Sequence, residues 1–273
     1  MAGLYVKDDD TWYLPKSIWV KSGTWRVCSN VYVKSGGTWK ELIKTVDITS
    51  SKSNFNLYEY LGSPSEPLSV VVNISSSVEI FSSDTSGNRT PAFTVGNFPT
   101  NSTVIINNNG YISGGGGFGG KGTWYGYDSG SNGTKGGDGI VKGSSNNFDI
   151  SIVNTGTIAG GGGGGGGAGS YYVYTETILG GQQGGYTRGG HGGDGAGIEG
   201  YSRTQGGNSA SNQNKYDRGI DGGQGGAIGE NGQDGQASGR QQKPNGKGGQ
   251  AGKAIIRSGM TIAVSGNIDG GIG

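Results

Sequence analysis

The sequence is poor in several residue types, and each shortage excludes a class of protein. A single cysteine, Cys28, stands in 273 residues, so no disulfide can form within the chain and we expect it to fold in a reducing cytosol. Apolar residues make up only 30% of the chain, below the usual ~45–50%. No apolar run approaches the ~20 residues that span a membrane, and no signal peptide is visible at the N-terminus. We therefore expect a protein that is not inserted in a membrane.

Charge and chemically reactive residues are also sparse. The net charge is +1, with both signs scattered along the chain, so nucleic acid is not an expected partner. The only histidine, His191, has no Ser or Cys nucleophile beside it, and the carboxylates are dispersed. We therefore expect no enzyme, no catalytic residues and no cofactor.

Three copies of Gly-x-x-Gly-x-Asp-Gly, containing Asp138, Asp194 and Asp234, loosely fit a calcium-binding nonapeptide. A calcium β-roll needs adjacent tandem copies, and these copies lie far apart. We therefore expect no metal site, and we place the three aspartates at turns or facing solvent.

Glycine is the residue that the chain has in excess. Of 63 glycines, seven precede Gly110 and 56 follow from there, so about one-third of the C-terminal part is glycine. Collagen would need a strict Gly-X-Y period and abundant proline. The chain has six prolines and only Pro244 falls in this part, which argues against collagen.

Within this glycine-rich part, glycine recurs at every third residue over short spans, as from Gly130 to Gly139 and from Gly223 to Gly235. This period matches a left-handed extended helix with three residues per turn and a rise of ~3.1 Å. Such a helix satisfies its main-chain groups only through close neighbours, and glycine removes the Cβ that would keep them apart. Ordering a residue costs ~1–2 kcal/mol and a hydrogen bond returns ~0.5–1.5 kcal/mol. Only a compact lattice of such segments should therefore be ordered.

The first 46 residues contain three similar segments that predict β-hairpins. They read "LYVKDDDTWY", "IWVKSGTWRV" and "VYVKSGGTWKEL", with alternating aromatic and polar residues around a polar turn. They either share one small core or present three equivalent faces to a three-fold partner. The tryptophans of these hairpins are core residues or docking anchors, and they are Trp12, Trp19, Trp25 and Trp39.

Period-two stretches between Asp47 and Asn109 predict further strands, and no helical pattern persists for more than a turn. One pattern then occurs three times: a strand, a turn, a second short strand and a run of glycines. Its copies are "STVIINNNGYISGGGG", "FDISIVNTGTIAGGGG" and "MTIAVSGNIDGGIG". We therefore predict an all-β N-terminal region over residues 1–109, with the hairpins in 1–46, and a glycine-rich domain over residues 110–273 with essentially no α-helix.

Four inserts rich in Tyr, Trp, Arg, Asn and Ser interrupt the glycines, a composition typical of adaptable binding loops. They cover Thr123–Asn132, Ser170–Leu179, Tyr201–Arg218 and Arg240–Asn245. If the glycine segments alternate in direction, all four inserts can fall at one end of the lattice. That arrangement requires one reversal between Gly180 and Gly200 and another near Ile228–Asn231.

Tryptophan-bearing hairpins, polyglycine runs and interposed aromatic segments together resemble the distal long-tail-fibre adhesins of T-even-type bacteriophages. The resemblance implies a monomeric adhesin, made in the host cytoplasm, that caps the trimeric distal subunit of the long tail fibre at the virion's fibre tip. It also implies a polyglycine type II sandwich whose loops bind an outer-membrane porin or similar bacterial surface protein and set host range. The four tryptophans named above become fibre-attachment candidates. The receptor-binding candidates are Trp124, Tyr125, Tyr127, Tyr171, Tyr172, Tyr174, Tyr201, Arg203, Tyr216, Arg218 and Arg240.

Two other functional classes stay open at this stage. A tail protein that binds or depolymerises polysaccharide would need acids clustered in a groove. An ice-binding protein built from polyglycine segments would need a flat and repetitive face, whereas these inserts are irregular and aromatic.

Overall fold

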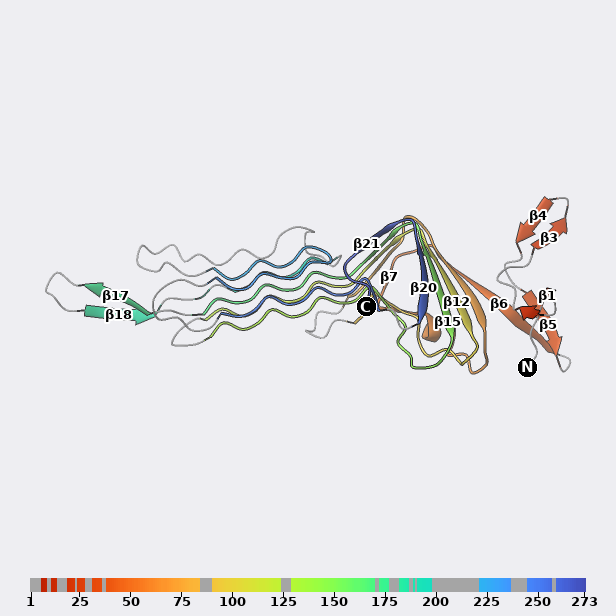
Figure 1. Cartoon of the computed structure of the whole chain (residues 1–273), viewed down its shortest axis with the longest axis horizontal. Helices are drawn as coiled ribbons and strands as arrows, with labels where there is room; N and C mark the ends of the chain where they lie inside the picture. The colour runs from red at the N-terminus through yellow and green to blue at the C-terminus, as the bar shows by residue number, and fades with distance from the viewer. Residues whose placement is uncertain are drawn as a thin grey trace.

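The computed structural model shows an all-β chain with almost no helix (Figure 1). It describes residues 6–8, 11–13, 19–22, 24–27, 31–35, 38–83, 90–123, 129–169, 172–176, 182–186, 189, 191–197, 221–236, 245–256 and 259–273. Helix α1 (Leu57–Tyr60) begins after Asn56, whose side chain accepts a hydrogen bond from the Glu59 N–H. In this described part of the chain, no helix is long and apolar enough to cross a membrane.

Three parallel sheets make up the body of the molecule. The first contains β6 (Thr38–Ile48), β9 (Ser69–Ile74), β12 (Thr103–Asn108), β15 (Asp149–Asn154) and β20 (Met260–Val264), with β5 (Val31–Ser35) added antiparallel at its edge. The second contains β7 (Lys52–Ser53), β10 (Glu79–Phe81), β13 (Tyr111–Ser113), β16 (Thr157–Ala159) and β21 (Asn267–Asp269). The third contains β8 (Phe55–Asn56), β11 (Phe93–Thr94), β14 (Ile140–Val141) and β19 (Ile255–Ile256).

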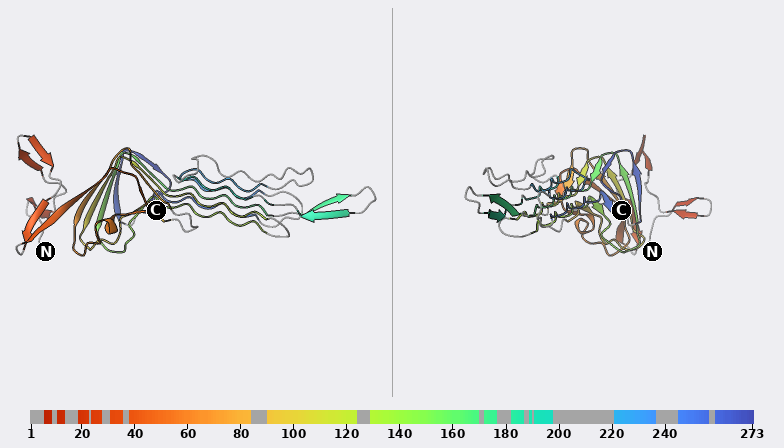
Figure 2. Two further views of the ribbon diagram at one scale, coloured as in Figure 1. Left: turned by 180° about the vertical axis from the view of Figure 1, so that it is seen from behind. Right: turned by 60° about the vertical axis from the view of Figure 1, so that its left-hand side comes forward.

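The chain passes through these three sheets in turn and so winds into a coil, which Figures 1 and 2 show next to the C-terminus. One circuit is β9, β10 and β11, the next is β12, β13 and β14, and each strand pairs in register with its equivalent one circuit away. The three matching sequence segments noted above are successive circuits, because β12–β13, β15–β16 and β20–β21 pair in that order.

Alternate side chains of each strand fill the inside of the coil. In β12 the buried residues Val104 and Ile106 lie in register with Ile150 and Ile152 of β15. Burying one such side chain is worth about 1.5–3 kcal/mol. The apolar core of the protein is therefore a stack of Val, Ile and Phe layers inside the sheets.

Two buried asparagines mark one corner of the coil. The Asn108 Nδ2 donates to Asn154 Oδ1 at 2.7 Å, and Asn154 Nδ2 donates to the Asn267 carbonyl at 3.0 Å. Both side chains are fully buried, and a buried amide without a partner costs about 1–3 kcal/mol. The ladder satisfies these amides at the turn between the first and second sheets.

The glycine-rich chain is inserted into two circuits of this coil. One insertion leaves β13 after Ser113 and returns to β14 at Ile140, and the other leaves β16 after Ala159 and returns to β19 at Ile255. The sheets therefore continue past residue 110, where the glycine content changes, and their last strands come from the C-terminus.

The inserted chain forms extended segments, which we call rods. They cover residues 114–123, 129–139, 160–169, 191–197, 221–227, 230–236 and 245–254. The views in Figures 1 and 2 show the rods running side by side away from the sheets. Main-chain hydrogen bonds join neighbouring rods at intervals of three residues, as in Gly117 N–H to Gly162 (2.8 Å) and Gly120 N–H to Gly165 (2.7 Å).

Rod 160–169, the central rod, is bonded to all six of the others. Its amides at positions 161, 164 and 167 donate to rod 129–139, those at 162 and 165 to rod 191–197, and those at 163 and 166 to rod 230–236. Its carbonyls accept from rods 114–123, 221–227 and 245–254. Each N–H from Gly160 to Gly167 thus has a main-chain acceptor, which meets the requirement that buried peptide groups be paired.

The central rod has eight consecutive glycines because other rods surround it closely. A Cβ placed on any residue from Gly160 to Gly167 would lie 1.9–2.2 Å from a carbonyl oxygen of another chain segment. The outer rods meet neighbours on only some sides, so they keep glycine at the inward positions and carry side chains at the others. Rod 129–139, for example, keeps Gly130, Gly133 and Gly136 against the central rod.

Candidate functional site

Several rods end together at the side of the lattice away from the sheets, which we call the distal end. There the Thr123 N–H donates to the Ala168 carbonyl (3.3 Å), and the Gly189 N–H donates to the Thr123 carbonyl (3.0 Å). The Gly169 N–H donates to Oδ1 of Asn245 (3.1 Å). Three of the four inserts therefore begin or end at one place, and from here we name them by the residues between their described flanks, 124–128, 170–188 and 237–244.

The reversal expected near Ile228–Asn231 is confirmed, and it lies at the sheet end of the lattice. A turn joins rods 221–227 and 230–236, and in it the Glu230 N–H donates to the Ala227 carbonyl (2.9 Å). Gly229 has φ +73° there, a conformation that glycine adopts without strain.

The insert Tyr201–Arg218 is flanked differently from the other three. Rods 191–197 and 221–227 run in the same direction, because the N–H groups of Gly193 and Ala196 donate to Gly223 and Gly226 respectively. Gly197 consequently lies toward the sheets and Asp221 at the distal end. The two described flanks of this insert therefore lie at opposite ends of the lattice, whereas strictly alternating rods would have placed both flanks at one end.

An antiparallel hairpin extends from the distal end of the central rod (Figure 1). It pairs β17 (Tyr172–Glu176) with β18 (Gln182–Tyr186). Two predicted receptor-binding residues, Tyr172 and Tyr174, lie on β17, opposite Tyr186 and Gly184 respectively. Tyr186 was not among the candidates, although the short "YTR" sequence at 186–188 was a signal for it.

The remaining receptor-binding candidates lie outside the described residues. They are Trp124, Tyr125, Tyr127, Tyr171, Tyr201, Arg203, Tyr216, Arg218 and Arg240. Three of the inserts that contain these candidates are flanked by described residues at the distal end: 124–128, 170–188 and 237–244.

The outer rods satisfy their outward-facing amides with side chains of adjacent rods. On rod 114–123, the N–H groups of Phe118 and Lys121 donate to Thr134 Oγ1 (2.7 Å) and Ser131 Oγ (2.6 Å). On the other flank, the Gly122 N–H donates to Nδ1 of His191 (3.2 Å). These side chains act as caps, because an edge of the lattice has no further rod to accept the bonds.

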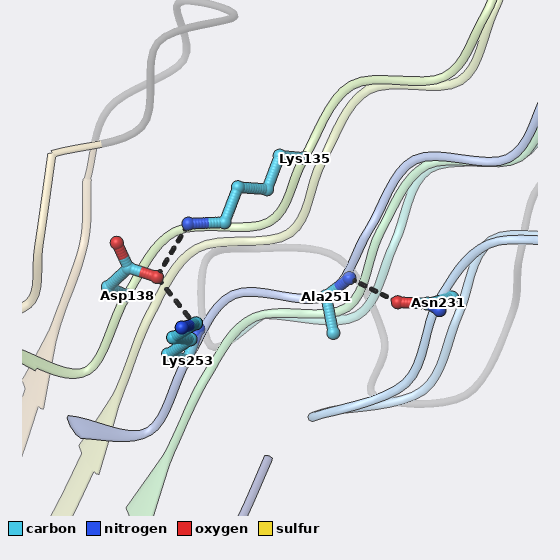
Figure 3. Close-up of polar contacts among 5 residues, drawn as sticks. All are labelled: Lys135, Asp138, Asn231, Ala251 and Lys253. Carbon is cyan, nitrogen blue, oxygen red and sulfur yellow. Dashed lines mark hydrogen bonds and ion pairs between the residues drawn. The ribbon is translucent and has the colours of Figure 1, made fainter. Parts of the chain in front are cut away.

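Figure 3 shows two such caps on rod 245–254. Asp138 Oδ1 accepts from the Lys253 main-chain N–H (2.7 Å) and from Nζ of Lys135 (2.8 Å). Asn231 Oδ1 accepts from the Ala251 N–H (2.7 Å). Rod 245–254 is therefore held by side chains from rods on both of its flanks.

The other two Gly-x-x-Gly-x-Asp-Gly motifs place their aspartates in the same role. Asp194 Oδ1 accepts from the Gly119 N–H (2.7 Å), and Asp234 Oδ1 accepts from the Gly248 N–H (2.9 Å). Asp234 also pairs with Lys247 Nζ (2.6 Å). The hydrogen bond from Lys247 and, to a smaller extent, the hydrogen bond from Gly248 lower the pKa of Asp234 below its ordinary value.

The three aspartates stand on three different rods, and each carboxylate is used by a main-chain N–H. Over the described ranges, no three His, Cys, Asp or Glu side chains gather where they could hold a metal ion. The recurrence of this motif has a structural reason in the lattice.

The three N-terminal hairpins share one pairing register. In β1 (Val6–Asp8) with β2 (Thr11–Tyr13), Lys7 is opposite Trp12. In β3 (Trp19–Ser22) with β4 (Thr24–Val27), Lys21 is opposite Trp25. In β5 with β6, Lys34 is opposite Trp39, so three of the four candidate tryptophans occupy equivalent backbone positions. The fourth, Trp19, begins β3 opposite Val27.

The fold and the site together describe a display scaffold: a coil of sheets carries rods whose far end presents several inserts. The model of the phage tail fibre adhesin Gp38 family matches residues 43–273, and the chain belongs to this family of tail-fibre adhesins.

Among solved structures, the chain is similar to the crystal structure of the gp37–gp38 adhesin tip complex of the bacteriophage S16 long tail fiber. The sequence identity is 24%, the match covers 86% of this chain and 83% of that chain, and the TM-score is 0.49. No curated protein matches the sequence.

Proposed function

We propose that this adhesin caps the distal end of a long tail fibre and binds an outer-membrane protein of the host bacterium through the inserts at the distal end. Binding is non-covalent and no reaction is catalysed. The aromatic side chains press onto the extracellular loops of a porin or similar surface protein, and their sequence sets host range. The virion carries the protein, made in the host cytoplasm, as a monomer at the fibre tip.

The convergence of the inserts is the observation that carries this proposal. The residues that flank 124–128, 170–188 and 237–244 are bonded to one another at the distal end, as in Gly169 N–H to Asn245 and Gly189 N–H to Thr123. Binding surfaces are commonly formed by loops that a rigid scaffold holds together. Tyrosine, serine, glycine and asparagine in such loops provide contact area at low entropic cost.

The rods support the proposal as a stiff stalk. Their three-residue bonding interval and close approach favour a polyglycine type II sandwich, in which each outer rod is bonded to the central rod. A stalk of this kind fixes the inserts at a distance from the sheets, so ordering them on binding costs less entropy.

Attachment to the fibre belongs to the N-terminal part of the chain in this proposal. Three hairpins with one register suit a trimeric distal fibre subunit, because one chain can then offer an equivalent face to each of three subunits. Trp12, Trp25 and Trp39 stand at the equivalent positions, and with Trp19 they are the proposed docking anchors.

Adsorption of the purified protein to cells tests the recognition role. The protein is applied to a panel of strains that each lack one outer-membrane protein, and loss of adsorption on one strain identifies the receptor. The Tyr171→Ala, Tyr172→Ala double variant is expected to adsorb at least about tenfold less, the loss expected when aromatic anchors are removed from an interface.

Tyr60→Ala is the matched control for this variant, because Tyr60 is an exposed tyrosine (59%) on α1, within the coil of sheets. Its adsorption should equal that of the unmodified protein. Full adsorption to every strain of the panel, or release of a sugar product on binding, would contradict the proposal.

A further inference from the structure

We propose that Thr123 and Asn245 are positioning residues that clamp the base of the β17–β18 hairpin and thereby fix its orientation toward the receptor. The inference rests on the proposed function, because it assigns a role to the hairpin as a recognition element. Both residues lie in the glycine-rich part of the chain, beside inserts other than the one they hold.

Asn245 holds the point where the chain enters the hairpin. Gly169 is the last described residue of the central rod, and its N–H donates to Asn245 Oδ1 at 3.1 Å. The neighbouring main-chain bond between these two rods runs the other way, from the Gly246 N–H to the Gly167 carbonyl (2.8 Å). The asparagine side chain therefore extends the lattice by one hydrogen bond beyond the end of the rod.

Thr123 holds the point where the chain leaves the hairpin. The Gly189 N–H is shared between the Thr123 carbonyl (3.0 Å) and the Thr123 Oγ1 (3.2 Å). Thr123 is only 5% exposed and Gly189 is buried, so water does not replace these bonds readily. Thr123 is itself tied to the central rod through its N–H bond to Ala168.

The two clamps differ from the other caps of the lattice in what they hold. The caps provided by Asp138, Asn231 and Thr134 hold main-chain N–H groups inside the rods, away from the two ends of the 170–188 insert. The clamps hold Gly169 and Gly189, the residues that immediately precede and follow the 170–188 insert. Losing the side-chain hydrogen bond to Gly169 or to Gly189 should therefore loosen the hairpin and leave the rods in place.

The clamps also connect three inserts to one another. Thr123 immediately precedes insert 124–128, and Asn245 immediately follows insert 237–244. The base of the hairpin is thus bonded to a boundary residue of each of two neighbouring inserts, and the three inserts share one foundation.

The test compares Asn245→Ala with Asn231→Ala, and Thr123→Val with Thr134→Val, in the full-length protein. In each pair both side chains accept a main-chain N–H, but only the first member holds the hairpin. Hydrogen–deuterium exchange of residues 172–186 and adsorption to host cells are measured, and the melting temperature reports on folding.

We expect Asn245→Ala to speed exchange of the hairpin amides roughly two- to tenfold, the range that follows from losing one hydrogen bond. Thr123→Val leaves the Thr123 carbonyl bond to Gly189 in place, so it should speed exchange toward the lower end of that range. Adsorption should fall with them, and the Asn231→Ala and Thr134→Val controls should change neither measurement. Asn245→Asp and Thr123→Ser keep the acceptor and should restore slow exchange. If Thr123→Val does not fold, the asparagine pair decides the question.

Unchanged hairpin exchange in both Asn245→Ala and Thr123→Val would overturn the clamp. Faster exchange with unaltered adsorption would support the clamp and would instead contradict the proposed role of the hairpin in recognition. The two failures are therefore distinguishable.

Discussion

At the scale of single residues, the number of neighbours of a rod decides how much glycine it needs. The central rod is bonded to six other rods, and a Cβ at any residue from Gly160 to Gly167 would meet a carbonyl oxygen within 2.2 Å. An outer rod faces fewer neighbours and carries side chains such as those of Lys135 and Asp138 at positions that do not face the central rod. The longest uninterrupted glycine run thus identifies the rod at the centre.

Replacing Gly163 by Ala should destabilise the protein by about 3 kcal/mol or more, the upper range for overpacking a rigid interior. The new Cβ would lie 2.0 Å from the Gly249 carbonyl oxygen, and one rod would have to move away from another. Scanning calorimetry measures the effect. Gly271→Ala is the control, because a Cβ there meets nothing within 4 Å, and equal melting temperatures of the two variants would contradict the tight packing.

At the scale of elements, the edges of the lattice depend on side chains in place of rods. Asp138, Asp194 and Asp234 each accept a main-chain N–H of a neighbouring rod. An edge amide without a partner would still be reached by water, so each cap contributes less than a bond in the interior. The caps chiefly fix the register between adjacent rods.

Asp234 makes one of these edges sensitive to pH. Its pKa is lowered by the hydrogen bonds from Lys247 and Gly248, so the folded state favours the carboxylate. The resulting stability is present above the ordinary aspartate pKa of about 3.9 and is lost as the pH falls through the lowered value. The effect is small, because both side chains are at least half exposed and solvent screens the pair.

The melting temperature of Asp234→Asn should accordingly lie slightly below that of the unmodified protein at neutral pH. The difference should shrink as the pH falls below about 4 and as salt is added. A difference that stays constant from neutral pH down to about pH 2 would show that the carboxylate charge at Asp234 does not matter.

Much of the element-level arrangement could be predicted from the sequence, and the reasons for the rest are physical. The sequence repeat of strand, turn, strand and glycines was recognised, whereas the pairing of its copies as successive circuits is seen only in the structure. The reversal near Ile228–Asn231 was predicted from the positions of the inserts. The winding of β9, β10 and β11 into one circuit was not predicted, because β10 and β11 have only three and two residues and show no recognisable period. The clamp residues Thr123 and Asn245 were missed as well, since a polar residue bordering a glycine run looks like part of a loop.

At the scale of the whole molecule, the rods are insertions in a coil that is built without them. The circuits pair through β12–β15 and β13–β16, and residues such as Phe93, Ile140 and Ile255 are fully buried between the sheets. These contacts involve strands that precede and follow the glycine-rich chain. The sheets and the rods therefore have separate sources of stability, one apolar and one from main-chain hydrogen bonds.

A chain in which short Gly-Ser connectors replace residues 114–139 and 160–254 should consequently keep its β-sheet circular dichroism and a cooperative melt. It should also lose adsorption to cells, because every proposed receptor-binding residue is removed. A chain that lacks only residues 170–188 is the comparison and should retain the rods. Loss of cooperative melting in the first chain and not in the second would show that the coil requires the rods.

The way the rods are joined to the coil also determines how the molecule responds to pulling. Rods 114–123 and 160–169 continue directly from β13 and β16, and rods 129–139 and 245–254 lead directly into β14 and β19. Tension applied at the inserts along the rod axis passes through four covalent connections into the sheets. It acts on the lateral bonds of each rod in shear, so many must break at once, whereas a sideways force would peel them one after another.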